Sequence, residues 1–303
     1  YQCVNNLNNI KSKPMEKSMN LGKFKQWYPN ISASDLSLLE LCLPPEIIMP
    51  PEELPEFVWI PECPFVMGDI FHNASNNVDG QNDEVPLRIL KLPGFWIAIN
   101  VVTNREYLEF LDTEYTSNTT DLRTQITELP ESAPVHSVNW DEAFAYCKWR
   151  EAQTPGKRVC LPTEAQWEKA AGWHLIGDEF ELGRKYEFGT GDDVDYEQTA
   201  FNRKTNFPYE VSKLSKGVNG LKGASGNVWE WCMDYYQADF YKECPDTTFN
   251  AQVCKRQVLR GGSWANVKRR LRISNRLGSA PSTRNDNFGF RLVVEPNTTG
   301  ETA

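Results

Sequence analysis

Long apolar segments, histidine and excess positive charge are all scarce in this 303-residue sequence. It contains no run of eighteen apolar residues, so we predict no segment that spans a membrane. The formal net charge is -9 at pH 7, which argues against nucleic-acid binding because phosphate groups require a basic protein face. The only histidines are His72, His136 and His174, and their wide spacing matches no pattern of metal ligands.

The chain begins with Tyr1 rather than methionine, so we expect that a leader or tag was removed, and any targeting signal with it. Its eight cysteines permit disulfides without requiring them. Cys244 and Cys254 flank a short loop and are the favoured pair, whereas Cys147 lies in a helical pattern and is expected to be buried. An extracytoplasmic or cell-surface location is weakly favoured by four glycosylation sequons, although about as many arise by chance: Asn30, Asn73, Asn118 and Asn297.

Hydrophobic residues make up 40% of the chain and aromatic residues 12%, which is enough for a sizeable core. The first part of the chain differs in texture from the rest. Ser32–Leu43 predicts a short helix with leucines on one face, and the proline-rich segment Pro44–Pro55 predicts an extended connector. We therefore predict an N-terminal extension over residues 1–53 and one domain over residues 54–303.

Three capped helices are predicted in this domain. Thr103 caps the first, and a glutamate three positions later completes a capping box. The second covers Asn139–Arg150 and the third Thr163–Ala171. Their tryptophans, Trp149 and Trp167, are expected to be core residues.

Alternating apolar residues predict short strands. Two lie within Phe57–Asp69 on either side of a turn, and a longer one covers Leu87–Ile99. Between them, His72–Glu84 is polar without an apolar period and is predicted to be a surface loop. Further along, two tryptophans alternate around Glu230 in the manner of a strand.

Several motifs occur in a fixed order along the chain: FVWIPECPFVMGD (Phe57–Asp69), FWIAINVVTNREYLEFL (Phe95–Leu111), PVHSVNWDEAFAYCKW (Pro134–Trp149), LPTEAQWEKAA (Leu161–Ala171), GASGNVWEW (Gly223–Trp231), LRGGSW (Leu259–Trp264) and NFGFRLVV (Asn287–Val294). On these residues the chain resembles the formylglycine-generating enzyme family over roughly residues 54–295. The resemblance implies an α+β, C-type lectin-like fold with low regular secondary structure, short antiparallel strands and flanking helices. Because one fold hosts many chemistries, function depends on particular side chains.

The family binds calcium in the turn before the tryptophan pair. The resemblance places the carbonyls of Gly226 and Val228 and the side chain of Glu230 in that site, while Gly223 stands where the family has an asparagine ligand. The alternative is that Glu230 accepts hydrogen bonds that hold the turn without metal. Of the family's second calcium site, only Asn202 matches.

Catalytic members of the family bind copper through two cysteines that follow the Gly-Gly-Ser motif, because a cuprous ion prefers thiolate ligands. Asn266 and Leu271 stand at these positions, so we expect no copper. The scarcity of histidine makes iron catalysis, as in related sulfoxide synthases, equally unexpected. Ser263 is expected to fix a turn rather than to act as a nucleophile.

Acidic pairs on loops are the remaining candidates for catalysis. Asp83 with Glu84, and Asp192 with Asp193, could form an acid and base pair, but we expect all four to be solvated loop charges.

The segment after Gly-Gly-Ser-Trp combines two kinds of residue. One set keeps the family's framework character and can tie loop backbone through hydrogen bonds: Arg269, Arg272, Asn275, Arg276, Pro281 and Arg284. Between the framework residues lie others that follow no apolar period, which we call the interspersed residues. Together with Trp264 they form the predicted binding surface: Ala265, Asn266, Val267, Arg270, Leu277, Gly278, Ser279, Thr283, Asn285, Asp286 and Asn287. The arrangement is similar to the variable proteins of diversity-generating retroelements, which diversify this segment.

The leading hypothesis is a non-catalytic protein that binds a protein or a cell-surface ligand through this surface. Two alternatives stay open. One is a cysteine-independent oxidase or modifying enzyme that uses the same groove, and the other is a structural subunit of a larger assembly.

Overall fold

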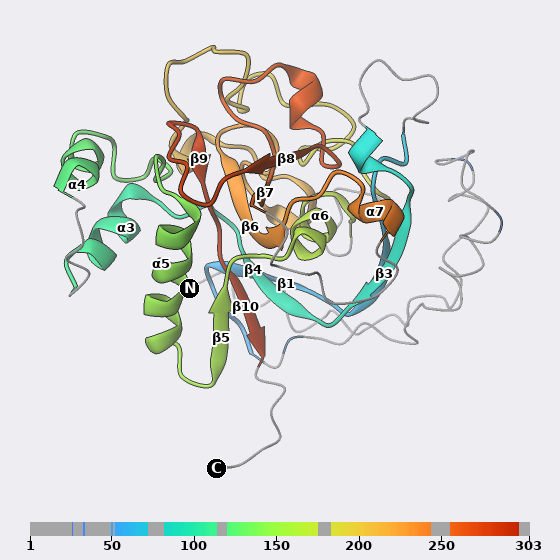
Figure 1. Ribbon diagram of the computed structural model, residues 1–303, viewed down its shortest axis with the longest axis horizontal. Coiled ribbons are helices and arrows are strands. Elements are labelled where there is room, and N and C mark those ends of the chain that lie inside the picture. Colours follow the sequence, from blue (N-terminus) through green and yellow to red (C-terminus); the bar gives the residue numbers. More distant parts are fainter. Residues whose placement is uncertain are drawn as a thin grey trace, which may run out of the picture.

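The computed structural model describes Gln26, Ala33, Pro50 and residues 52–71, 82–113, 120–174, 183–243 and 255–296. Within these ranges the strands form two four-stranded sheets and one two-stranded sheet, with helices packed beside them (Figure 1). No described helix is long and apolar enough to cross a membrane. Apart from Ala33, the predicted helix at 32–43 lies outside the described residues, as do the sequons and the proposed Cys244–Cys254 pair.

The first sheet joins the two ends of the domain. Its order is β1 (Phe57–Ile60), β4 (Phe95–Ala98), β10 (Val293–Pro296) and β5 (Lys157–Cys160), and all its pairs are antiparallel. These strands are rich in Val, Ile, Phe and Trp, which suit a half-buried pleated surface. Strand β10 is therefore held between β4 and β5, which lie much earlier in the sequence.

The second sheet pairs β2 (Cys63–Met67) with β3 (Arg88–Leu92). The prediction of one strand over Leu87–Ile99 is wrong, because β3 and β4 are separate strands in different sheets. Between them lie a proline, which cannot donate to a strand ladder, and Gly94, where a Cβ would lie 2.3 Å from the Trp59 ring. The break therefore has a local cause.

The third sheet carries the C-terminal motifs. Its order is β8 (Arg276–Ser279), β7 (Gln257–Arg260), β6 (Trp229–Tyr235) and β9 (Phe288–Gly289), and the β6–β9 pair is parallel. The strand predicted around Glu230 is confirmed as β6. Because β7 and β8 are antiparallel neighbours, the loop between them starts and returns at the same end of the sheet.

Helices α3 (Asn104–Leu111), α5 (Trp140–Ala152) and α6 (Glu164–Gly172) confirm the three predicted ones. Each starts with a complete capping box, on Thr103, Asn139 and Thr163. Two further helices were not predicted: α4 (Thr120–Thr127), which lies beside α3 in Figure 1, and α7 (Phe240–Glu243). Short 3-10 turns complete the described structure: η2 (Asn82–Glu84), η3 (Val211–Lys213), η4 (Val218–Gly220) and η5 (Lys268–Leu271).

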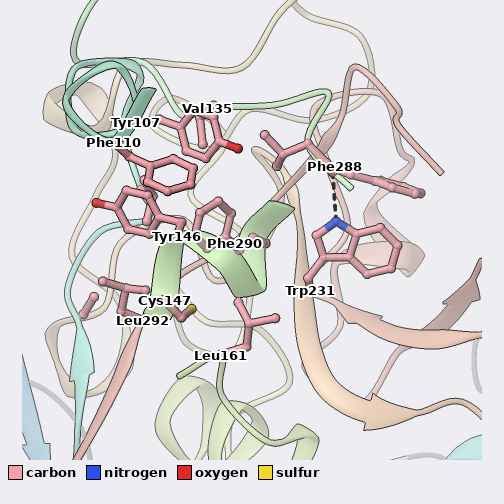
Figure 2. Packing of buried hydrophobic residues seen from close by; sticks show 14 of the residues in the cluster. Tyr107, Phe110, Val135, Tyr146, Cys147, Leu161, Trp231, Phe288, Phe290 and Leu292 are labelled. Carbon is pink, nitrogen blue, oxygen red and sulfur yellow. Dashed lines mark hydrogen bonds between the residues drawn. The ribbon is translucent and has the colours of Figure 1, made fainter. Parts of the chain in front are cut away.

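Aromatic side chains fill the core between α3, α5 and the C-terminal strands (Figure 2). Tyr107 stacks on Tyr146 with ring centroids 5.7 Å apart, and Phe290 meets Tyr146 edge-on at 5.3 Å. The buried Trp231 donates from Nε1 to the carbonyl oxygen of Val138 at 3.0 Å. Each such side chain contributes roughly 1.5–3 kcal/mol by burial. Of the tryptophans assigned to the core, Trp167 is buried and Trp149 is partly exposed.

Candidate functional site

The loop between β7 and β8 begins with two glycines in the left-handed region, Gly261 at φ 93° and Gly262 at φ 73°. A Cβ on Gly262 would lie 2.7 Å from the carbonyl oxygen of Arg270. Only glycine permits this close approach without strain. The motif therefore folds the chain tightly back against the loop that follows it.

Buried arginines anchor that loop to the rest of the domain. Arg272 donates to both carboxylate oxygens of Glu84 at 2.8 Å and to Asp69 at 3.0 Å, with all three side chains no more than 2% exposed. Arg276 grips the two oxygens of Glu164 at 2.6 and 2.9 Å. Two of the predicted framework residues thus tie the loop to segments far away in sequence.

The prediction that Asp83 and Glu84 are solvated loop charges is wrong. Glu84 is fully buried against Arg272, and Asp83 is 7% exposed and accepts a hydrogen bond from Tyr236 at 2.8 Å. Burial raises the pKa of Asp83 above its ordinary value, and the Tyr236 hydrogen bond opposes the shift. Asp192 and Asp193 are exposed, as expected, and pair with Arg184 and Lys268, respectively.

A third buried arginine was not singled out in the sequence. Arg260 donates to Glu164 at 2.9 Å and to Glu168, and its guanidinium lies 5.4 Å from the centre of the Trp167 ring. Burial alone would raise the pKa of Glu168, but the nearby Lys185 and Arg260 cations hold it below its ordinary value. The carboxylates of α6 therefore connect the helix with β7 and β8.

The two positions of the family's copper ligands are occupied by residues with other tasks. The side chain of Leu271 is fully buried in a small apolar cluster with Phe188, Val194 and Phe201. Asn266 accepts a hydrogen bond from Ser263 at 2.7 Å. Neither side chain offers a thiolate.

The cysteines that the structure describes are all buried elsewhere: Cys63, Cys147, Cys160 and Cys232. Burial raises their pKa values, to about 12 for Cys160. Among the described residues no group of three or more His, Cys, Asp and Glu side chains is placed to hold a metal ion.

Ser263 fixes the turn, as expected. Its hydroxyl donates to Asn266 and accepts from Nδ2 of Asn287 at 3.0 Å. The structure therefore brings together two predicted surface residues that lie 21 positions apart. The Nδ1 atom of His136 lies 3.1 Å from the hydroxyl of Ser137. Burial lowers the pKa of His136, and the nearby Asp286 opposes that shift.

The proposed calcium ligands do not fit a cation in this conformation. Both carboxylate oxygens of Glu230 are held by Arg291, at 2.6 and 2.7 Å, and Oε2 also accepts from the Trp167 indole at 2.7 Å. A guanidinium so close to the carboxylate would repel a divalent ion. Gly226 lies at φ 84° and donates to Gly261, which holds the turn by hydrogen bonding. Asn202, from the second calcium site, is exposed and uses its backbone N–H to bind Asn266.

Exposure separates most of the interspersed residues from the framework. Val267, Asn285 and Asp286 are exposed, and the following are partly exposed: Ala265, Asn266, Arg270, Leu277, Gly278, Ser279, Thr283 and Asn287. Trp264, also assigned to the binding surface, is only 6% exposed and packs as a structural residue.

The framework assignment holds for some residues and not for others. Arg272, Asn275 and Arg276 are buried. Arg269 is exposed, and Arg284 binds Glu142 at 2.6 Å although its own side chain is 51% exposed. The buried framework residues thus lie at the end of the loop between β7 and β8 and at the start of β8.

A second loop, residues 196–207, lies against the first, and no sequence pattern indicated that it belongs to the candidate site. Asn202 donates its N–H to the carbonyl of Asn266 at 2.7 Å, and Arg203 donates to that of Trp264 at 2.9 Å. Both loops lie at the upper end of the molecule in Figure 1. This loop exposes Tyr196 and Phe207. Apolar period cannot reveal such residues, because tertiary packing decides whether an aromatic side chain on a loop is covered.

The profile of the sulfatase-modifying factor enzyme 1-like domain matches residues 46–296. Serine/threonine-protein kinase Pkn1 of Chlamydia trachomatis is 32% identical over 264 residues, which cover 80% of this chain and 40% of that protein. The chain thus spans about two fifths of the length of the chlamydial kinases that it matches.

Two other relatives carry the enzyme's name. The inactive Cα-formylglycine-generating enzyme 2 of Bos taurus is 28% identical over 75% of this chain and 85% of its own length. The formylglycine-generating enzyme of Streptomyces coelicolor is 31% identical over 60% of this chain and 58% of its own length.

Solved structures support the same architecture. PvdO from Pseudomonas aeruginosa superposes with a TM-score of 0.62 at 24% identity, covering 82% of this chain and 97% of its own. Treponema denticola variable protein 1 gives 0.59 at 20% identity, covering 79% and 95%. The predicted α+β, C-type lectin-like fold is confirmed.

Proposed function

This chain belongs to the sulfatase-modifying factor enzyme 1-like domain family. We propose that it is a non-catalytic member that binds a protein or cell-surface ligand through residues 264–287, which we call the C-terminal loop. One observation carries the proposal. Buried charge pairs on Arg272 and Arg276 fix the loop, while the interspersed residues expose their side chains. A rigid scaffold that presents adaptable side chains is the general design of a binding loop.

The chemistry at the family's copper positions supports this proposal. Leu271 cannot bind a metal and is packed in an apolar cluster, and Asn266 is occupied with Ser263. A relative named as inactive shows that the family includes members without the enzyme's activity. The kinase activity in the name of the chlamydial relatives belongs to proteins of which this chain spans about two fifths.

Two polar atoms at the loop also favour binding. Trp264 Nε1 and Asn287 Oδ1 are buried and have no hydrogen-bond partner in the described part of the chain. Buried polar atoms without partners are unfavourable. A bound ligand or a water molecule would satisfy them.

Oxygen uptake tests the absence of catalysis. The protein, loaded with copper and given a cysteine-containing peptide and a reductant, should consume no oxygen above the copper-only control. Turnover would instead support the alternative, a cysteine-independent oxidase. The matched comparison is a double variant, Asn266→Cys with Leu271→Cys, which restores the thiolates and should bind copper where the parent does not.

The proposal has a finer form, in which the interspersed residues are diversified by a retroelement. The mixture of residues that lies between the framework residues motivates this finer form. The fold of Treponema denticola variable protein 1 is compatible with it. Sequencing the genomic neighbourhood tests it. A reverse transcriptase beside a near-copy of the segment that encodes residues 264–291 is the expected result, and their absence would reject the finer form while leaving the binding function standing.

A further inference from the structure

We propose that the binding surface extends beyond the C-terminal loop to the loop at residues 196–207, and that its partner is an acidic polypeptide segment carrying apolar side chains. This inference rests on the proposed function and specifies the partner for the same site.

Exposed apolar side chains are concentrated on these two loops. Among the described residues, the large hydrophobic side chains that are exposed are Tyr196 (49%), Phe207 (55%) and Val267 (49%). Tyr196 and Phe207 lie on the second loop, and Val267 follows Asn266, to which that loop is bonded. Aromatic side chains that are exposed and rigidly held are typical anchors of protein interfaces.

The second loop is fastened at several points. Asn227 donates its N–H to the carbonyl of Ala200 at 2.9 Å, and the Asn227 side chain accepts from the N–H of Tyr209 at 2.8 Å. Phe207 is therefore carried on a short span between the Arg203–Trp264 bond and the Tyr209–Asn227 bond. A surface held in this way loses little conformational entropy when a partner binds.

The tip of this loop is a strained turn. Asn202 and Arg203 both have φ of 54°, and Lys204 closes the turn with a hydrogen bond to the carbonyl of Phe201 at 3.2 Å. Positive φ at both central positions is the geometry that Asn-Gly prefers, so arginine at the second position costs stability. Strain of this kind is retained mainly at functional sites.

Cations without a carboxylate partner among the described residues lie on the same two loops as these apolar side chains. Lys268 is neutralised by Asp193 at 2.6 Å, whereas Arg203 and Arg269 are exposed and form no ion pair with any residue that the structure describes. Lys204 is also exposed, and its ammonium binds the carbonyl of Tyr196. Three unpaired cations therefore face solvent on a protein whose net charge is -9.

Two carboxylates, on Asp195 just before the second loop and on Glu197 within it, weaken this positive field at one end. Asp195 accepts the N–H groups of Glu197 and Gln198 at 3.0 Å, and the Glu197 side chain is exposed. They precede the turn, while the cations lie on it and on the C-terminal loop. The charge pattern therefore fits an acidic segment that lies across the turn with its apolar side chains on Tyr196, Phe207 and Val267.

Fluorescence anisotropy with four labelled twelve-residue peptides and a single-stranded oligonucleotide tests both halves of the proposal. One peptide combines Glu with Leu and Phe, one has Glu without apolar residues, one combines Lys with Leu and Phe, and one combines Ser with Leu and Phe. The first should bind most tightly and weaken with added salt. Equal binding of the purely acidic peptide, stronger binding of the Lys or Ser peptide or of the oligonucleotide, or no binding at all would overturn it.

Variants on each loop separate this inference from the proposed function. Arg203→Glu and Phe207→Ser should each lower the affinity for the peptide of Glu, Leu and Phe by about tenfold or more, as expected for central interface residues. The control Lys148→Glu, a charge reversal on α5, should leave binding unchanged. If Val267→Asp abolishes binding while the two variants of the second loop do not affect it, the extension is wrong and the proposed function stands. If none of these three variants changes the affinity, both the extended surface and the proposed binding function are wrong. Circular dichroism checks that each variant is folded.

Discussion

Arg291 holds Glu230 through two hydrogen bonds, from Nε to Oε2 at 2.6 Å and from Nη2 to Oε1 at 2.7 Å, with both side chains completely buried. The pair connects the segment after β9 to β6, directly beside the turn where the family resemblance placed calcium. Arg291 also donates to the carbonyls of Ala98 and Lys222 at 2.9 Å. One guanidinium thus performs the cross-linking that a metal ion would otherwise provide.

Removal of calcium should therefore leave the protein's melting temperature unchanged. A ligand that binds only the folded state raises the melting temperature by mass action, so chelation lowers it only where an ion is bound. Scanning calorimetry with EDTA, and again with added calcium, makes the measurement. A drop on chelation that calcium reverses would contradict the arginine account and restore the calcium site.

Loss of a framework arginine should be severe. Arg272→Ala would leave Glu84 and Asp69 buried without a cation, which costs about 3–5 kcal/mol. Urea unfolding measures the effect. Arg269→Ala is the matched control, because this arginine is exposed and should change stability by less than about 0.5 kcal/mol. Similar losses in the two variants would show that the ion pairs at Arg272 do not anchor the loop.

Arg203→Gly should stabilise the protein. The backbone at this residue has φ of 54°, which glycine adopts without the steric cost that arginine bears. We expect a gain of about 0.5–1 kcal/mol in the free energy of unfolding. Lys204→Gly, one residue further on, lacks this reason and should be neutral or destabilising. A loss of stability in Arg203→Gly would contradict the strained turn.

Asp234 should make stability depend on pH. Burial, and secondarily Glu164, raise its pKa from 3.8 to about 6. Because the folded-state pKa lies above the unfolded one, the contribution of this group is full below about pH 4 and is lost as pH rises to about 6.

Asp234→Asn should remove that dependence. The amide oxygen can still accept the N–H of Glu164, which binds the carboxylate at 2.6 Å. Since Asp234 is partly exposed and solvent screens it, we expect a gain of only about 1 kcal/mol at pH 8 and none at pH 4. Urea unfolding at both pH values, with the exposed Asp239→Asn as control, measures it. Equal effects at the two pH values would contradict the raised pKa.

Features that depend on neighbouring residues were predictable from the sequence. The capping boxes on Thr103, Asn139 and Thr163 have their partners three residues away, and the three helices start where these patterns indicated. The C-terminal motifs gave the fold through family resemblance. Even the division between β3 and β4 had a local signal, in the proline and Gly94 that separate them.

Features that depend on distant partners were not predictable in this way. From the sequence we predicted a solvated charge at Glu84. In the structure Arg272, which lies 188 residues further on, binds this carboxylate. Arg260 and Arg291 are both fully buried, although no pattern in their neighbouring residues indicates which partners they bind. Phe207 joins the candidate site only because backbone bonds fasten its loop to the C-terminal one. One-dimensional patterns carry no record of such contacts.

The most direct test of the recognition surface is a paired scan in which each variant is measured for melting temperature and for affinity to a partner identified by pull-down. The exposed set, Val267→Ala, Asn285→Ala and Asp286→Ala, should change stability by less than about 0.5 kcal/mol yet lower the affinity, with a few central residues dominating. The buried set, Arg272→Ala and Trp264→Ala, should lower the free energy of unfolding by roughly 3–5 kcal/mol. The melting temperature should fall accordingly. Should the exposed set prove as destabilising as the buried set, or leave the affinity untouched, the loop is a packed structural element and not a binding surface.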